Sequence, residues 1–477
     1  MPTSQKLVLI GLDACDRGLM AAHAADLPNI SAILAAGQVG ELEAEPMSGG
    51  IWATFVTGVR PDVHGVVHQL QWDPEQMRMR CPGRDWLPIR PFWRDLGARG
   101  ARVVAFDVPF VFPGEAPNVL EVMNWGAHDL VGPFWTSDPA LGRRIRARHG
   151  LHPMGVDIPV PKTPRQLERH LGQVLDGAAR KADLAVELMR EQPWDVFITA
   201  FGEIHRGGHS WPAGDPDNPR TEDDLIRIYQ AVDRAVGAMV EAAGPEADIV
   251  LFSLHGMGPN TSQAHLTSKF MQRAVAHFRG RPLPPEDSDA PGLMRSLRKK
   301  VPPGLQLMIA EVMPQWVRDS VVSREIAGGY RWDDTLGFCL HGDPSGYLRL
   351  NLRGREAKGV LGPDEAAALK AFLREELLAA TLDDGRKAVA RVAFPSEEAQ
   401  GPRAHLLPDV LVEWNPQAAP AGALHTPNLG VIRATPHTGR GGNHRFDAFY
   451  AHRGPRQATA FRPGHISELG ALVADLT

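Results

Sequence analysis

The sequence has few cysteines, no long apolar run and no excess of one charge. Its three cysteines, Cys15, Cys81 and Cys339, are odd in number and widely spaced, which argues against a disulfide framework. No stretch approaches the roughly 18 apolar residues that a membrane-spanning helix needs. The apolar run at residues 7–12 is too short for the core of a secretory signal peptide. We therefore expect a cytoplasmic protein without a membrane partner.

Charge is nearly balanced, since 51 lysines and arginines face 56 aspartates and glutamates, for a net charge of −5. No long block of either sign occurs, so neither a nucleic-acid-binding stripe nor a polybasic membrane patch is indicated. What is present is typical of a globular protein with a substantial core: 43% of the 477 residues are hydrophobic and 22% are charged. The oligomeric state stays open.

Short apolar runs predict central strands of a parallel sheet that is buried on both faces. They lie at residues 6–12, 101–108, 194–201, 247–254 and 408–414, and helical patterns separate them at residues 27–37, 165–192 and 221–244. Strands that alternate with helices favour an α/β fold. Residues 260–345 interrupt this rhythm with proline, glycine and charge. We expect a single domain over residues 1–477, with a cap inserted near residues 260–345.

Potential metal ligands follow several of the predicted strands. They are Asp13, Glu203, His205, His209, His255 and, in a later glycine-rich loop, His444. A lone histidine in such a place is usually structural, and an aspartate after a strand is often a helix cap. Ligands of open α/β sheets, however, bind beyond the carboxyl ends of the strands. The gathering of these residues at one predicted edge therefore favours a metal site.

Ser48 is followed by two glycines, which let the backbone approach a ligand closely. A serine in that setting is either a metal-activated nucleophile or an ordinary turn residue, and composition alone does not separate the two.

The order of several segments resembles the alkaline phosphatase superfamily, and within it the type I phosphodiesterase/nucleotide pyrophosphatase branch. The segments are VLIGLDA, LPNISAILAAGQVGEL, WATFVTGVRPDVHGV, HRGGH, FSLHGMG and GNHRFDAFY. The resemblance covers most of the chain outside the expected cap. It implies an α/β/α sandwich that holds two metals, often zinc, at the strand ends.

In the family pattern, one metal is held by an early aspartate, the nucleophile, and the Asp-His pair of a Ser-Asp-His-Gly stretch. By resemblance, Asp13, Ser48 and His255 match three of these ligands, and Leu254 stands where the second aspartate is expected. A leucine side chain cannot ligate a metal. The resemblance thus implies a weakened second site.

The other metal of the family pattern is held by an Asp-x-x-x-His motif and a late histidine. His209 and His444 match two of these ligands, and His205 stands where the aspartate is expected. Three histidines with an open fourth position form a good catalytic zinc arrangement. We expect one tightly bound Zn²⁺ there and a second, weaker divalent ion at the other site, with Glu203 as a candidate replacement carboxylate. Iron and manganese are alternatives to zinc.

The resemblance implies metal-dependent hydrolysis of a phosphate ester, a diester or a monoester of a small anionic metabolite, with Ser48 attacking phosphorus. Position and aromatic character add Trp52, Trp125 and His128 as weaker candidates for substrate contacts. Sulfate or phosphonate ester hydrolysis, group transfer, redox chemistry and a binding protein without catalysis stay open, because a fold does not fix a function. The exchange of an aspartate for His205, still a good ligand, indicates a site that has been rebuilt rather than lost.

Overall fold

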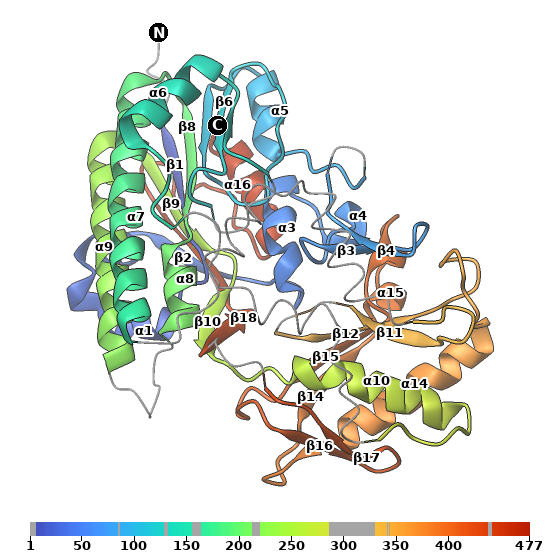
Figure 1. The fold of residues 1–477 in the computed structure, drawn as a ribbon. Coiled ribbons are helices and arrows are strands. Elements are labelled where there is room, and N and C mark those ends of the chain that lie inside the picture. The colour runs from blue at the N-terminus through green and yellow to red at the C-terminus, as the bar shows by residue number, and fades with distance from the viewer. Residues whose placement is uncertain are drawn as a thin grey trace.

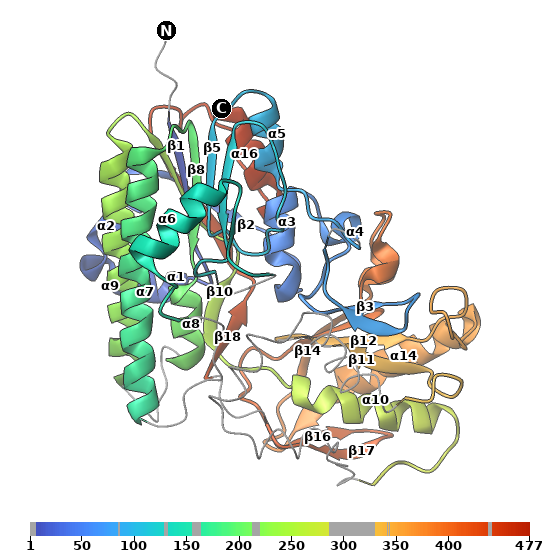
Figure 2. The ribbon, with the colours of Figure 1, turned by 45° about the horizontal axis from the view of Figure 1, so that its top comes forward.

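The molecule has two lobes, which Figures 1 and 2 show from two directions. The computed structural model describes residues 6–83, 86–127, 132–154, 164–211, 220–285, 330–340, 342, 344–436 and 441–477. No helix in these ranges is long and apolar enough to cross a membrane.

The first lobe is built on an eight-stranded sheet. Its order is β2 (Gln38–Leu42), β19 (Ala448–Arg453), β9 (Asp248–Ser253), β1 (Leu7–Leu12), β8 (Val196–Phe201), β5 (Val103–Phe106), β6 (Val119–Met123) and β7 (Trp135–Thr136). The five strands from β9 to β6 run parallel, and β19 and β7 flank them in the antiparallel sense. The predicted, mostly parallel sheet is confirmed.

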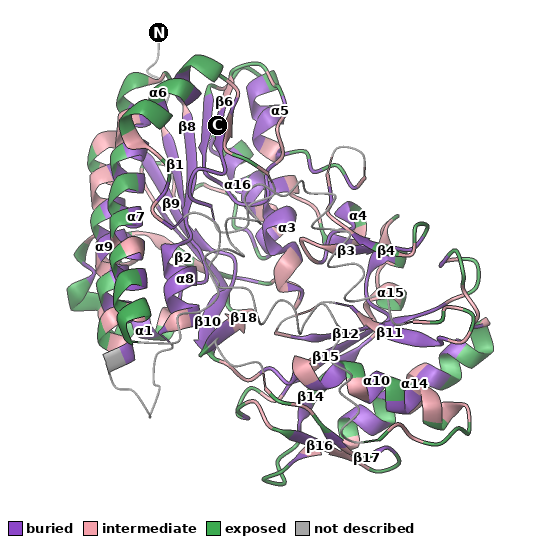
Figure 3. Ribbon diagram, in the orientation of Figure 1, coloured by how far each residue is buried: buried purple, intermediate pink, exposed green. Residues whose placement is uncertain are grey.

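Helices cover both faces of this sheet. One face carries α2 (Pro28–Ala36), α6 (Pro139–His149), α7 (Pro164–Glu191) and α9 (Arg220–Ala243), and the other carries α3 (Ile51–Thr57), α5 (Phe92–Ala98) and α16 (Leu469–Asp475). Along β1, Val8 and Ile10 pack into the first layer, while Leu7 and Leu9 pack into the second. Because successive side chains of a strand point to opposite faces, an unbroken apolar run is buried on both sides (Figure 3). The predicted α/β/α sandwich is confirmed.

The second lobe is a separate antiparallel sheet. Its order is β11 (Gly337–Leu340), β12 (Gly346–Leu350), β15 (Val410–Trp414) and β14 (Val389–Ala393), and it packs with α10 (Ala264–Phe278), α14 (Pro363–Ala379) and the small sheet of β13 (Thr381–Leu382), β16 (Ala423–Thr426) and β17 (Gly430–Arg433). The prediction that residues 408–414 belong to the central sheet is therefore wrong. The bounds of the insertion near residues 260–345 stay a prediction, because residues 286–329 lie outside the described residues.

The segment between β2 and α5 lies between the lobes. It contains the single turn η2 (Ser48–Gly50), α3, α4 (Pro61–His64), β3 (Gln71–Asp73) and β4 (Arg78–Arg80). Figures 1 and 2 both place β3 near β12, and α4 beside the short helix α15 (Pro395–Glu398) of the second lobe.

Candidate metal centre

The register of the central strands brings the predicted ligands to one edge of the sheet. Leu12, the last residue of β1, lies opposite Phe201, the last residue of β8, and Gly11 lies opposite Phe252 of β9. The residues that follow these three parallel strands therefore emerge side by side. They include Asp13 after β1, α8 (Glu203–Ser210) after β8, and His255 after β9.

His205 and His209 lie four residues apart on α8, so they share one face of the helix. Both side chains are buried, and their Nε2 atoms lie 3.1 Å apart. The glycines between the two histidines allow α8 to pack closely on its neighbour. A Cβ atom on Gly208, for example, would lie 2.5 Å from the Met257 side chain. The helix can therefore lie flat against β10 (Gly256–Pro259).

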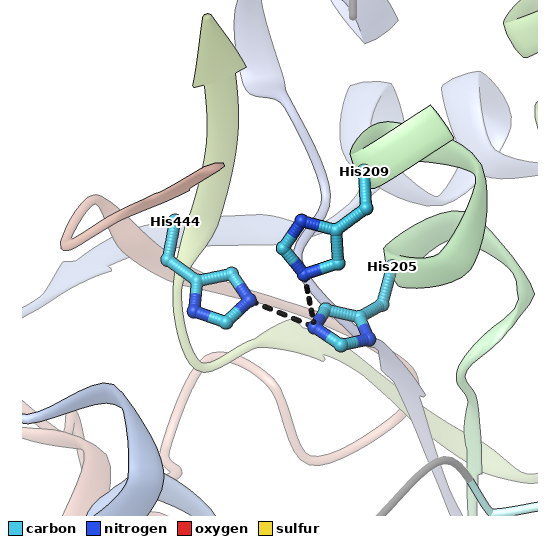
Figure 4. A group of neighbouring side chains, drawn as sticks. All are labelled: His205, His209 and His444. Carbon is cyan, nitrogen blue, oxygen red and sulfur yellow. Dashed lines mark hydrogen bonds between the residues drawn. The ribbon is translucent and has the colours of Figure 1, made fainter. Parts of the chain in front are cut away.

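His444 reaches the same point from the other side of the centre. It lies on β18 (Gly442–Arg445), which pairs with β10 so that His444 lies opposite Met257. Its Nε2 atom is 2.7 Å from His205 Nε2 (Figure 4). Ligand atoms of His205, His209 and His444 all lie within 4.8 Å of one another.

The hydrogen bonds of these rings leave nitrogen lone pairs that a cation could bind. The Nδ1 atom of His209 donates to the Gly442 carbonyl at 2.9 Å, which leaves a lone pair on its Nε2. Three Nε2 atoms thus converge, and a hydrogen bond between neutral rings can satisfy only two of them at a time. A divalent ion would accept all three lone pairs, and the backbone carbonyl on Nδ1 is a usual support for such a ligand. The donor set fits zinc, with one position open.

Asp13 lies beside the three histidines and is almost fully buried. Its Oδ1 atom accepts a hydrogen bond from Trp52 Nε1 at 3.1 Å and lies 3.4 Å from His255 Nε2. Its Oδ2 atom is 3.9 Å from His205 Nδ1. The next residue, Ala14, has a φ of 55°, an uncommon value for a residue with a side chain. The carboxylate therefore lies close to both His205 and His255, whose neighbour His444 has its ring centroid 4.6 Å from that of His255.

His255 is oriented in the same way as His209. Its Nδ1 atom donates to the Gly256 carbonyl at 3.2 Å, so its Nε2 presents a lone pair toward Asp13. A neutral imidazole lone pair and a carboxylate oxygen repel each other unless a proton or a cation lies between them. The pair thus fits a second divalent ion, with fewer protein ligands than the first.

Leu254 is buried in an apolar cluster. It is 1% exposed and belongs to the apolar cluster of α3 and the sheet, together with Trp52, Phe55 and Phe252. The position that the resemblance assigns to an aspartate is thus filled by core packing.

Ser48 opens the turn η2, which leads directly into α3. It is partly exposed and precedes Trp52, the donor to Asp13, by one helical turn. The two glycines after it are needed for close packing: a Cβ atom on Gly50 would lie 2.4 Å from the Val66 carbonyl oxygen. The serine therefore lies on the turn that leads into α3, the helix whose Trp52 donates to Asp13.

The structure does not bring Glu203 to the three histidines of the candidate metal centre. Glu203 precedes His205 by two residues, so the two side chains leave α8 on nearly opposite sides. Glu203 Oε1 instead lies 3.1 Å from His152 Nε2. Burial acts to raise the pKa of Glu203, but the hydrogen bond to His152 and the charges of Lys181 and Arg206 outweigh it and lower that pKa to about 2. We therefore leave Glu203 out of the ligand set.

Of the three weaker candidates for substrate contacts, two are buried in packing contacts and the third lies outside the described residues. Trp52 is buried and holds Asp13, as described above. Trp125 is buried, donates from Nε1 to the Gly150 carbonyl and packs edge-on against His152. His128 lies outside the described residues. Trp52 and Trp125 are thus packing and positioning residues in this structure.

Sequence reasoning missed the backbone carbonyls of Gly442 and Gly256, which fix the tautomers of His209 and His255. A signal for both exists in the sequence, because Gly256 directly follows His255 and Gly442 comes two residues before His444; each of these glycines begins a short strand. It also missed His64, which lies behind the Ser48 turn: its Nδ1 accepts from Val66 N and its Nε2 lies 3.0 Å from Thr54 Oγ1.

Comparison with known proteins agrees with the resemblance seen in the sequence. A family model described as "Type I phosphodiesterase / nucleotide pyrophosphatase" matches residues 7–306. Phosphonoacetate hydrolase from Sinorhizobium meliloti, in complex with phosphonoformate, is 14% identical with a TM-score of 0.52, over 99% of this chain and 96% of that chain. Murine ectonucleotide pyrophosphatase / phosphodiesterase 5 is 11% identical with a TM-score of 0.51, over 99% and 95%. No curated protein matches the sequence. At these identities, the two structures inform the fold alone.

Proposed function

Because the chain belongs to the type I phosphodiesterase / nucleotide pyrophosphatase family, in the alkaline phosphatase superfamily, we propose that it is a metal-dependent hydrolase of a small-molecule phosphate ester, a diester or a monoester. The observation that carries this proposal is the convergence of three histidine Nε2 atoms beside the carboxylate of Asp13. Family membership supports phosphoester hydrolysis, and the histidines support a metal centre.

The proposed tight metal site consists of His205, His209 and His444, and zinc is the ion that this neutral donor set suits best, with iron or manganese as alternatives. The proposed weak site consists of Asp13, His255 and Ser48. Its support is the approach of Asp13 Oδ1 and His255 Nε2 at 3.4 Å. Bound ions would stabilise negative charge on the phosphoryl oxygens and on the attacking oxygen.

In the proposed reaction, Ser48 Oγ forms a bond to phosphorus while the bond to the leaving oxygen breaks. Water then cleaves the phosphoserine and releases phosphate or a phosphomonoester. Trp52 holds the Asp13 carboxylate through its indole N–H, and the two glycines after Ser48 allow the turn to pack tightly against residues 66–68. The chain's own part in the reaction is thus nucleophilic attack and rigid placement.

Two substitutions distinguish the role of the serine from the role of the metal. We expect Ser48→Ala to keep the bound metal and lose at least about 1,000-fold of turnover, because only the attacking atom is removed. His209→Ala should lose both metal and turnover. His425→Ala is the control, since His425 is partly exposed and paired with Asp383 in the second lobe. Metal content per chain and hydrolysis of a phosphodiester are the two measurements. Unimpaired turnover in Ser48→Ala would remove the serine from the mechanism.

A panel of phosphate, sulfate and phosphonate esters, assayed with the same protein, tests the substrate class. We expect phosphate esters to be hydrolysed fastest. Faster cleavage of a sulfate or phosphonate ester would move the activity to another member of the superfamily. Protein that binds zinc and cleaves none of the esters would instead support a binding protein or a different metal-dependent reaction.

A further inference from the structure

The carbonyl oxygen two residues before Ser48 is held by the second lobe. Ser345 Oγ donates a hydrogen bond to the Pro46 carbonyl at 3.1 Å, and Tyr347 Oη donates to the same oxygen at 3.4 Å. Ser345 is 2% exposed and Tyr347 is 1% exposed. Both lie at the start of β12, about 300 residues further along the chain. Both donor side chains are buried and the two hydrogen bonds are part-buried, so losing either hydroxyl would leave the Pro46 carbonyl with fewer partners.

Apolar packing supports the same connection. Met47, which directly precedes Ser48, belongs to a cluster with Phe338, Tyr347 and Leu411 of the second lobe. Trp72 from β3 joins this cluster and packs edge-on against Phe338, with ring centroids 4.7 Å apart. The residue before the serine is thus buried in the interface of the two lobes.

On its other side, the Ser48 turn packs closely against residues 66–68. A Cβ atom on Gly49 would lie 2.7 Å from His68 Cα, and one on Gly50 would lie 2.4 Å from the Val66 carbonyl oxygen. The segment 66–68 is fixed in turn, since Val67 N donates to Gln71 Oε1 at 2.7 Å. The turn is therefore enclosed between residues 66–68 and the second lobe.

A second group of contacts docks the lobe on α4, close to the same segment. Gly401 N donates to Asp62 Oδ2 at 2.7 Å, and Arg403 Nη1 donates to the His64 carbonyl at 2.9 Å. The second lobe thus contacts the segment 46–64, which contains Ser48, near both of its ends.

We infer that the second lobe positions the Ser48 hydroxyl at the metal centre, with Ser345 and Tyr347 as the positioning residues. The inference rests on the proposed role of Ser48 as nucleophile. The contacts of Ser345 and Tyr347 are made to Pro46 in the serine turn, whereas the proposed tight metal site is built on α8 and β18, so we expect their loss to act on the serine and leave the metal in place. A displacement of the nucleophile by a fraction of an ångström is enough to slow an in-line attack.

The test is the pair of single variants Ser345→Ala and Tyr347→Phe, together with the double variant. In the double variant we expect kcat for a phosphodiester to fall by about 10-fold or more, with little change in KM and an unchanged metal content. Ser396→Ala and Tyr330→Phe are the matched controls: Ser396 Oγ bonds Asp409 within the lobe, and Tyr330 packs in the same aromatic cluster as Trp72. Both controls should keep the kcat of the parent protein.

Amide hydrogen exchange of residues 47–52 gives a readout that does not depend on turnover. Exchange there should be faster in the double variant than in the controls, while α8 stays as protected as in the parent protein. If the parent protein cleaves no ester but the exchange changes as expected, the proposed function fails and the anchoring of the turn stands. Unchanged exchange, or an unchanged kcat in the double variant, would overturn the inference. The single variants each remove only one hydroxyl, which guards against loss of the fold.

Discussion

Leu254 lies directly before His255, and its side chain is buried in an apolar cluster that includes Trp52, the donor to Asp13. A carboxylate in that apolar cluster would be costly without a counter-charge, because a buried charge must be paired. The same carboxylate next to His255 and Asp13 would add a ligand to the weak site. The consequences for stability and for metal binding are therefore opposite in sign.

We expect Leu254→Asp to unfold at a lower temperature than the parent protein when metal is removed, and to recover stability when zinc is added. Ligand binding to the folded state alone raises stability in this way. Its metal content should rise toward about two ions per chain, as in a complete pair of sites. Leu254→Asn is the control, since it has the same shape without the charge. Equal responses to zinc in the aspartate and asparagine variants would contradict this expectation.

Asp13, His205, His209 and His255 were predictable because they follow buried strands whose register carries them to a common edge, whereas His444 reaches that edge through the pairing of β18 with β10. Glu203 was not, because spacing along the sequence does not reveal on which side of a short helix a carboxylate lies. Its partner His152 comes from a segment 51 residues earlier that carries no recognisable pattern. Trp52 was found by its aromatic character, but its role depends on a hydrogen bond to Asp13 that no local pattern encodes.

Short strands decide the geometry of the centre at the scale of elements. Pairing of β10 with β18 places His444 opposite α8, and the Gly442 carbonyl then orients His209. A Cβ atom on Gly442 would lie 2.0 Å from the Gly208 carbonyl oxygen, which is backbone of α8 and cannot rotate away. The close approach of β18 to α8 therefore requires glycine.

Gly442→Ala should push β18 away from α8 and weaken zinc binding by about 10-fold or more, the usual effect of losing an orienting partner. Competition with a chromophoric chelator measures the affinity, and circular dichroism checks the fold. Gly422→Ala is the matched control, because nothing lies within 4 Å of the added methyl group there. An affinity equal to that of the control would show that this contact does not set the ligand geometry.

The assignment of residues 408–414 shows where an element cannot be placed from its own sequence. Val410 and Val412 pack into one apolar cluster of the second lobe and Leu411 packs into another, so β15 is buried on both faces like a central strand. A run of apolar residues has the same pattern in either sheet. Only the strands that pair with β15, namely β12 and β14, show to which of the two sheets it belongs. Those strands lie up to about 60 residues away in the chain.

At the scale of the whole molecule, both lobes contribute to the state of His64. Its ring is buried beneath the Ser48 turn, and burial, aided by the nearby charge of Arg403 from the second lobe, lowers its pKa to about 4 despite the opposing charges of Glu45 and Asp62. The neutral ring accepts from Val66 N and, through Nε2, donates to Thr54 Oγ1. Protonation would break the first of these bonds.

The pH dependence of stability follows from this lowered pKa. Between the ordinary pKa of histidine and about 4, the unfolded chain binds a proton that the folded chain excludes, so stability falls as the pH falls through this window. From about pH 7.5 to about pH 5, the parent protein should lose about 2 kcal/mol more free energy of unfolding than His64→Gln, which has no such proton to bind. Urea denaturation of both proteins, with metal removed from each, measures the difference. Parallel losses in the two proteins would assign the acid sensitivity to other groups.

The place of β19 in the sheet has a consequence for synthesis on the ribosome. This strand, made near the end of translation, inserts between β2 and β9, which are made far earlier. Until it emerges, β2 has no neighbour in the central sheet, and His444, just before it, has not joined the other two imidazoles. A nascent chain therefore carries only part of the proposed metal site, and a metal bound there would be captured after translation is almost complete. Premature termination would yield a product that cannot compete with the finished enzyme for zinc.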